Sequence, residues 1–135
     1  MKRTRLAKKS KSLIRKIQDE LWQECRRIVF NRDSKNGEVD CYTCPAKNLQ
    51  SSNKQLGHVP DPKSVLPAFC KYDLKRLKYQ CWNCNINHGG MGGAAQRRME
   101  KEFGKEYMEQ LEKDRQVTVK AIDFYVELLE KYKTM

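Results

Sequence analysis

The sequence lacks any long apolar run, and its mean hydropathy of −0.89 is low for a folded domain. A membrane-spanning helix needs about 20 consecutive apolar residues, so we expect no transmembrane segment and no membrane partner. The basic N-terminal residues are not followed by an apolar segment, which argues against a secretory signal. We therefore expect a cytoplasmic protein. A chain of 135 residues with so thin a core also needs an additional cross-link.

Acidic residues are absent from residues 1–16, although the whole chain has 17 Asp and Glu beside 28 Lys and Arg and a net charge of +11. The rest of the chain is therefore nearly balanced in charge. We expect residues 1–11 to be a disordered basic arm that contacts DNA phosphates, with a solubility tail as the alternative. The predicted DNA-contacting residues are Lys2, Arg3, Arg5, Lys8, Lys9, Lys11, Arg15 and Lys16.

Proline and histidine are scarce and are confined to the middle of the chain. All four prolines precede residue 68, and the two histidines are His58 and His88. Proline interrupts helices, so we expect residues 41–88 to hold only short elements, among them a strand over 55–59. This region therefore concentrates both the residues that break helices and those that carry chemistry.

Apolar residues at helical spacing predict helices on both sides of this region. The first helix runs over 12–31, and a helix or helix pair runs over 94–113, where Gly104 favours a break. A last helix runs over 118–133. The predicted fold class is α+β and helix-rich, with a single domain over 12–135.

Six cysteines are present, and four of them form two Cys-x-x-Cys knuckles. These four are Cys41, Cys44, Cys81 and Cys84. Two such knuckles supply four thiolates in tetrahedral geometry around one structural Zn²⁺. The alternatives are two disulfides or four buried thiols, and a reducing compartment disfavours disulfides. The other cysteines, Cys25 and Cys70, are expected to be buried small side chains, and Tyr42 and Trp82 are expected to pack against the zinc site.

Polar residues suited to hydrolysis stand beside the knuckles. A short helix over 82–88 would place Asn85 and His88 on one face, and the strand would present His58 toward that face. A neutral imidazole can take a proton from water, and a hard cation such as Mg²⁺ or Mn²⁺ can stabilise the departing oxygen of a phosphodiester. For His58 alone, a hydrogen-bonded structural histidine is the alternative. The joint pattern favours phosphodiester hydrolysis.

The stretch from Cys41 to His88 resembles the four-cysteine branch of the HNH, or His-Me finger, nucleases. More narrowly, it resembles the lambdoid phage NinG/Rap recombination endonucleases, and its order and spacing also resemble phage endonuclease VII. The matching elements are the two knuckles, Gly57-His58, Tyr72-Asp73, Gln80-Cys81, Cys84-Asn85 and Phe103-Gly104-Lys105-Glu106. The resemblance implies a zinc-stapled ββα-metal (HNH) finger over 41–88, flanked by an N-terminal helix and by C-terminal helices over 94–133.

The resemblance also assigns roles to the polar positions. The knuckle cysteines match the structural zinc ligands, His58 matches the general base, and Asn85 matches a residue that helps to hold the catalytic Mg²⁺ or Mn²⁺. His88 matches a position that serves the metal site or contacts phosphate in relatives. Many relatives have Asp or His directly before the base, where this chain and the NinG/Rap group have glycine, here Gly57. The second metal ligand is therefore unassigned among the candidates Asp61, Asp73 and His88.

The function implied by the resemblance is metal-dependent cleavage of branched recombination intermediates, such as Holliday junctions or D-loops. The implied setting is the cytoplasm of a bacterial host, with a phage or prophage origin. A junction has local two-fold symmetry, so paired cuts need two active sites and we expect a homodimer. The alternatives are an HNH enzyme that nicks ordinary duplex DNA, a non-catalytic zinc-stapled DNA-binding protein, and a zinc-based protein-interaction module.

Overall fold

A computed structural model of the chain describes residues 5–116 and 120–135, with side chains described from residue 12 onward. The chain divides into two compact units, one formed by Met1–Ile28 with Lys120–Met135 and the other by Val29–Val119. The single domain expected over 12–135 therefore corresponds to two units. None of the helices in the described residues is both long and apolar enough to span a membrane.

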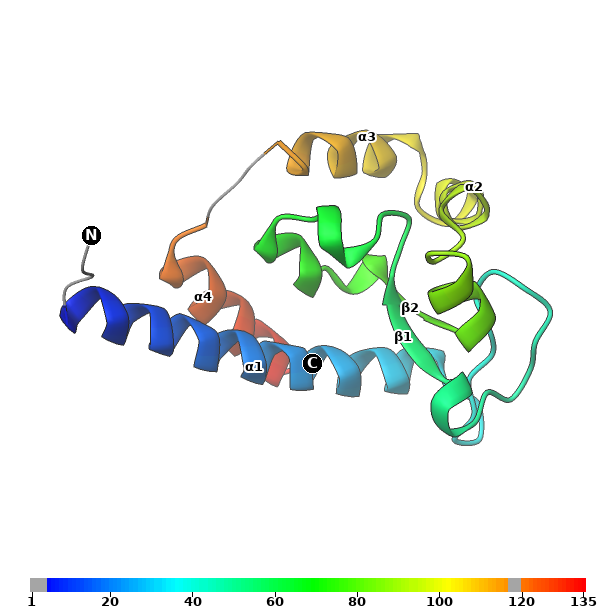
Figure 1. The fold of residues 1–135 in the computed structure, drawn as a ribbon, viewed down its shortest axis with the longest axis horizontal. Helices are drawn as coiled ribbons and strands as arrows, with labels where there is room; N and C mark the ends of the chain where they lie inside the picture. The colour runs from blue at the N-terminus through cyan, green and yellow to red at the C-terminus, as the bar shows by residue number, and fades with distance from the viewer. Residues whose placement is uncertain (1–4, 117–119) are drawn as a thin grey trace. The chain divides into compact units, whose positions relative to one another are not determined.

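The first unit consists mainly of two helices, α1 (Arg5–Asp33) and α4 (Ile122–Lys133), and the last turn of α1 belongs to the second unit (Figure 1). Helix α1 begins at Arg5 rather than at residue 12, so the prediction of disorder is wrong for residues 5–11. The segment has no glycine or proline, and its lysines and arginines are good helix formers. Residues 1–4 of the predicted arm lie outside the described residues.

Apolar side chains and a few polar contacts join α1 to α4. Leu21 and Cys25 on α1 are fully buried, and Leu129 and Tyr132 on α4 are almost fully buried. Arg27 Nη2 donates a hydrogen bond to the carbonyl oxygen of Tyr132 at 3.0 Å. Helix α4 begins four residues later than predicted, and residues 117–119 lie outside the described part of the chain.

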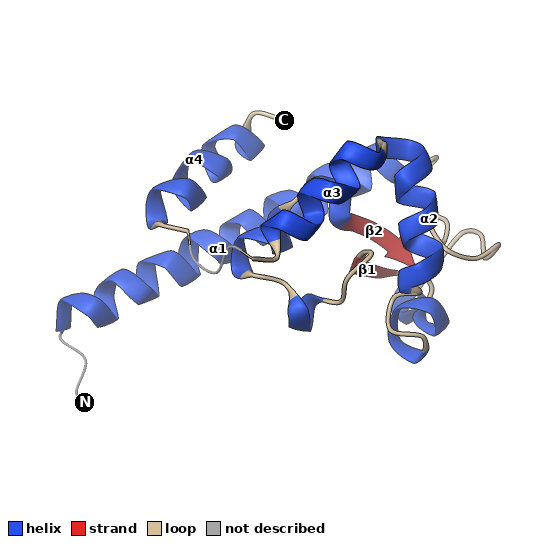
Figure 2. Cartoon of the chain, turned by 90° about the horizontal axis from the view of Figure 1, so that it is seen from above, coloured by secondary structure: helices blue, strands red, loops and turns tan. Residues whose placement is uncertain are grey.

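A small antiparallel sheet organises the second unit (Figure 2). Strand β1 (Gln55–His58) pairs with β2 (Leu77–Gln80), and Gly57 lies opposite Lys78 in the register. The predicted strand over 55–59 is thus confirmed. Between the strands the chain forms three short 3₁₀ turns, η2 (Lys63–Val65), η3 (Ala68–Tyr72) and η4 (Leu74–Arg76). Another short turn, η1 (Ser51–Asn53), precedes β1.

The elements after β2 place a helical turn and two helices beside the sheet. A single π-helical turn, η5 (Asn83–Asn87), follows β2 at the predicted position of a short helix. Helices α2 (Gly92–Phe103) and α3 (Lys105–Asp114) then meet at Gly104, whose φ of +89° suits glycine. The predicted break at Gly104 is therefore confirmed, and the fold is helix-rich with a two-stranded sheet.

The hydrophobic core of the second unit lies between the sheet region and these two helices. It is formed by Tyr42, Val59, Ala95, Met99 and Leu111, with Phe103, Tyr107 and Met108 packed against it. Contact with the first knuckle residue Tyr42 fixes α2 beside the cysteine-bearing loop. The core therefore positions the segments from which the candidate site is built.

A buried arginine holds the turns before β2 in place. Arg76 is fully buried, and its Nη1 and Nε lie 3.8 Å and 3.7 Å from carboxylate oxygens of Asp61 and Asp73. Its Nη2 donates to the carbonyl oxygen of Leu111 at 3.4 Å. Tyr107 on α3 donates to the Asp73 carboxylate at 3.0 Å. These contacts tie η4 and the loop after β1 to α3.

Candidate metal centre and catalytic site

The four knuckle cysteines form one cluster, as their spacing predicts. Their sulfur atoms all lie within 4.8 Å of one another, and Cys44 Sγ lies 3.6 Å from Cys81 Sγ. Four sulfurs about 2.3 Å from one zinc ion in tetrahedral geometry would lie about 3.8 Å apart, so the cluster is compatible with structural zinc. Cys41 and Cys44 precede β1, whereas Cys81 and Cys84 lie at the junction of β2 and η5. A bound ion would therefore fix η5 to the loop before the sheet.

The surroundings of the sulfurs also suit a cation. The backbone N–H of Ala46 donates to Cys44 Sγ at 3.5 Å, and the N–H of Cys84 donates to Cys81 Sγ at 3.4 Å. Burial and the neighbouring thiols raise the pKa of Cys84, although a hydrogen bond with Thr43 acts in the opposite direction. Without a cation, the four sulfurs cannot all ionise so close together. The donor set thus fits Zn²⁺, which requires thiolates.

His58 occupies the last position of β1 and is only 9 % exposed. Its Nε2 lies 3.0 Å from the carbonyl oxygen of Lys71 in η3. A carbonyl oxygen can only accept a hydrogen bond, so Nε2 carries the proton and Nδ1 is the basic nitrogen of the neutral ring. Burial lowers the pKa of His58, and the positive charges of Lys63, Lys71 and Arg76 lower it further, while the bond to the Lys71 carbonyl raises it.

Asn85 lies in η5 and packs against the residue that precedes His58. A Cβ atom added to Gly57 would stand 2.5 Å from Asn85 Oδ1 and 3.1 Å from Gln80 Oε1. The absence of a side chain at Gly57 therefore leaves the space that the Asn85 carboxamide fills. The structure thus brings Asn85 to the strand that carries His58.

His88 ends the η5 turn, and its side chain is exposed. Its backbone N–H donates to the carbonyl oxygen of Asn83 at 3.0 Å. Within the described residues, the cysteine cluster is the one group of three or more His, Cys, Asp or Glu ligand atoms close enough to share an ion. The other two candidates for a second metal ligand, Asp61 and Asp73, are instead paired with Arg76. No second metal ligand follows from the predicted set.

Sequence reasoning did not identify Gln80 as a functional residue. This side chain is fully buried, and its Nε2 donates to Thr43 Oγ1 at 2.9 Å and to the carbonyl oxygen of Gly90 at 2.8 Å. Gln80 therefore links the first knuckle to the loop after the second. The available signal was the Gln80-Cys81 pair in the sequence, although the polar composition of the strand gave no sign that this amide is buried.

The two knuckle aromatics differ in their surroundings. Tyr42 is buried, as predicted, and the guanidinium carbon of Arg98 lies 4.0 Å from the centre of its ring. Trp82, in contrast, is 45 % exposed. The half-exposed Ile86 stands one helical turn further on. The outer side of η5 therefore presents apolar surface next to Asn85.

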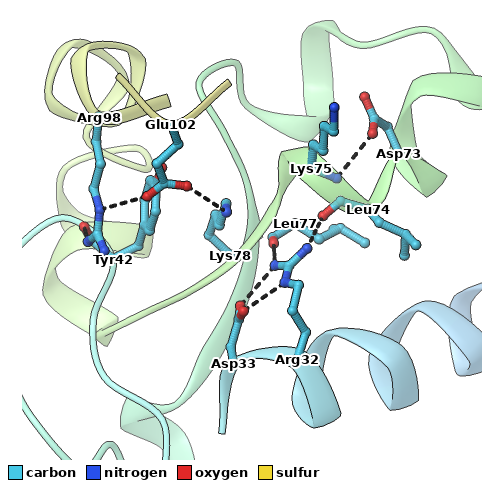
Figure 3. Close-up of polar contacts among 10 residues, drawn as sticks. All are labelled: Arg32, Asp33, Tyr42, Asp73, Leu74, Lys75, Leu77, Lys78, Arg98 and Glu102. Carbon is cyan, nitrogen blue, oxygen red and sulfur yellow. Dashed lines mark hydrogen bonds and ion pairs between the residues drawn. The ribbon is translucent and has the colours of Figure 1, made fainter. Parts of the chain in front are cut away.

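A cavity of about 490 Å³ opens beside the first knuckle. Figure 3 shows the polar contacts that Arg32, Lys78 and Glu102 make at its wall. Lys78 on its wall is 6 % exposed and pairs with Glu102, which also pairs with Arg98. Burial lowers the pKa of Lys78, and the charge of Arg32 lowers it further, while Glu102 raises it. Arg32 donates to the carbonyl oxygens of Leu74 and Leu77, both at 2.7 Å. The charged groups here pair with one another and hold β2 in place.

The predicted DNA-contacting residues are only partly described. Lys2 and Arg3 lie outside the described residues. The backbone of α1 includes the next four, whose side chains lie outside the description: Arg5, Lys8, Lys9 and Lys11. Arg15 and Lys16 are exposed on α1, where Asp19 and Glu20 follow them one helical turn later. The predicted DNA-contacting segment is therefore helical from Arg5 onward.

Comparison of the chain with protein-family models, with curated proteins and with solved structures gave no match. The function is therefore inferred from the geometry of His58, Asn85 and the cysteine cluster.

Proposed function

We propose that the protein is an HNH-type endonuclease that hydrolyses phosphodiester bonds in branched double-stranded DNA. In this proposal, β1, β2 and η5 form the ββα-metal finger, and the cysteine cluster holds a structural zinc ion. The observation that carries the proposal is the hydrogen bond between His58 Nε2 and the Lys71 carbonyl oxygen, at 3.0 Å. It leaves Nδ1 as the basic nitrogen, on a strand in contact with the Asn85 carboxamide.

His58 is the general base of the proposed reaction. Its Nδ1 takes a proton from a water molecule, whose oxygen attacks phosphorus as the P–O3′ bond breaks. Burial and three nearby cations keep the imidazole neutral near pH 7, the state in which it can accept a proton. The bond to Lys71 fixes the tautomer and the orientation of the ring.

Asn85 is the residue that would hold the catalytic cation, through Oδ1. A bound Mg²⁺ or Mn²⁺ supplies charge stabilisation for the departing oxygen. A neutral amide oxygen fits a hard cation of this kind, and substrate phosphates and water complete its shell. His88, exposed at the end of the same turn, is proposed to contact a DNA phosphate.

The preference for branched DNA is supported by the NinG/Rap resemblance of the motifs. Paired cuts at a junction require two active sites, so the proposal includes a homodimer. Sedimentation velocity with and without a four-way junction tests this part, and a monomer under both conditions contradicts it. Exposed basic residues on α1, such as Arg15 and Lys16, would contact phosphates without sequence preference.

Cleavage of a four-way junction and of a linear duplex with the same arm sequences tests the proposal. The zinc-loaded protein is compared with His58→Ala in Mg²⁺ or Mn²⁺, and junction binding is measured in parallel. We expect the wild type to cut the junction, and His58→Ala to bind it without cutting. Equal cutting of both DNAs would favour a duplex nickase, and binding without cutting by the wild type would favour a non-catalytic DNA-binding protein.

A further inference from the structure

Gln80 carries a buried oxygen whose role the hydrogen bonds of the second unit do not explain. The orientation of its amide is fixed, because the Gly90 carbonyl oxygen can only accept and must therefore face Nε2. The other amide atom, Oε1, is buried and has no hydrogen-bond partner among the described residues. Burying an unpaired carbonyl oxygen is unfavourable, so its presence here points to a partner of another kind.

A second amide oxygen approaches the same point beside Gly57 as the unpaired oxygen. Gln80 Oε1 and Asn85 Oδ1 both approach the point where a Cβ of Gly57 would stand, at 3.1 Å and 2.5 Å. Gly90 adds no side chain on the other side, where a Cβ would stand 3.8 Å from Gln80 Oε1. Two acceptor oxygens cannot bond to each other. A cation, or a water molecule that donates to both, would satisfy the pair.

The location favours a cation. Gln80 lies on β2 next to Cys81, and Asn85 lies in η5 next to Cys84. An ion bound by these cysteines would fix the positions of the two amides relative to each other. Both oxygens approach Gly57, the residue of β1 that directly precedes the proposed base His58. Carboxamide oxygens are ordinary ligands of hard divalent cations.

We propose that Gln80 Oε1 and Asn85 Oδ1 together bind the catalytic divalent cation, with Gln80 as the second protein ligand. This inference rests on the proposed function, in which a cation serves the reaction at His58. Gln80 takes the place of the acidic or histidine ligand that Gly57 lacks. Because both protein ligands are neutral, the cation binds weakly to the free protein and more tightly once DNA phosphates contribute further oxygens.

Mn²⁺ binding to the junction complex tests the proposal without relying on cleavage. The His58→Ala protein, loaded with zinc, is mixed with a four-way junction, and free Mn²⁺ is followed by electron paramagnetic resonance. Adding Gln80→Met is expected to weaken the protein-dependent Mn²⁺ site at least about tenfold. Gln55→Met makes the same chemical change at the residue paired with Gln80 in the sheet, and it is expected to leave Mn²⁺ affinity unchanged.

A second variant separates a ligand from a structural residue. Gln80→Met also removes the bonds to Thr43 and Gly90, so circular dichroism and zinc content are measured for each protein. Gln80→Glu places a carboxylate oxygen at the same position and is expected to tighten Mn²⁺ binding, a gain that a purely structural role would not produce. Unchanged Mn²⁺ affinity in both folded variants would overturn the proposal and would indicate a bridging water.

Failure of the ligand proposal is distinguishable from failure of the proposed function. If the wild type cuts the junction but Mn²⁺ affinity does not depend on Gln80, the nuclease stands and the ligand assignment is wrong. If Mn²⁺ affinity depends on Gln80 but the wild type cuts no DNA, the cation site stands and the proposed reaction is wrong.

Discussion

Asn85 Oδ1 lies 2.5 Å from the point that a Cβ atom of Gly57 would occupy, a separation that real Cβ contacts do not show. The glycine is therefore part of the site, because its missing side chain makes room for the carboxamide. The position has no unusual backbone requirement, so a substitution there tests space alone.

Gly57→Ala is expected to displace Asn85 and to lower the rate of DNA cleavage at least about tenfold while leaving zinc content unchanged. The added methyl group requires the Asn85 amide to move out of its place over β1. Cleavage kinetics and zinc analysis check this outcome. Gly93→Ala is the matched control, because its Cβ would meet only Arg97 Nη1 at an ordinary 3.6 Å. Cleavage at the wild-type rate by Gly57→Ala would contradict the role of Asn85.

The pH dependence of activity is expected to follow the lowered pKa of His58. Its ordinary value is 6.5, and burial lowers it in the folded protein. Activity falls only at a pH low enough to protonate the base. We therefore expect the acid limb of kcat/KM to lie below pH 6.5. In the variant His88→Ala, His58 is the only imidazole left, and its titration can be followed by NMR. A His58 pKa at or above 6.5 would contradict the expectation.

The lowered pKa of His58 also predicts how the free energy of unfolding changes with pH. Between the folded pKa of His58 and 6.5, the unfolded chain binds more protons than the folded protein. The contribution of this group to the free energy of unfolding is therefore fully present above pH 6.5 and is lost as the pH falls. Urea unfolding of His58→Gln beside the wild type, over pH 5 to 7, is expected to show a smaller pH slope for the variant.

Removal of zinc is expected to unfold the region between Cys41 and Cys84, because the binding energy of a structural zinc ion is also folding energy. Circular dichroism and the melting temperature, measured before and after a chelator, check this outcome. Cys70→Ala is the control, since Cys70 is buried outside the cluster. One equivalent of zinc should remain in that variant. An unchanged melting temperature after chelation would contradict the zinc assignment.

Asp73→Ala is expected to destabilise the protein by about 3 kcal/mol, because it leaves the buried Arg76 charge with one carboxylate fewer. The change also removes the acceptor for Tyr107 and the bond from the backbone N–H of Lys75. Urea unfolding measures the loss. An exposed acid on α3, Glu109, serves as the control, and Glu109→Ala should change stability by less than about 0.5 kcal/mol.

Local spacing was sufficient to predict several parts of the structure. The cysteine cluster, β1 and the break at Gly104 all follow from residues that act over short distances along the chain. The metal and catalytic functions of these residues stay predictions.

The features that the sequence concealed depend on contacts between distant residues. Strand β2 carries Lys78 and Gln80, which look exposed in the sequence but are buried against Glu102 and Thr43. No short-range pattern in the sequence predicts these contact partners. The helix over residues 5–11 differs from the prediction for another reason: a run of basic residues suggests disorder, although lysine and arginine favour helices.

The hydrogen bond that orients His58 has a backbone atom of Lys71 as its acceptor, and a side-chain substitution does not remove a backbone atom. Replacing the Lys71 side chain leaves the acceptor in place, so alanine scanning across η3 would assign the tautomer of His58 to no single residue. Only an insertion, a deletion or another change in the path of η3 would remove the acceptor. The proposed base is therefore protected against most point mutations in its supporting segment and is sensitive to changes in the length of that segment.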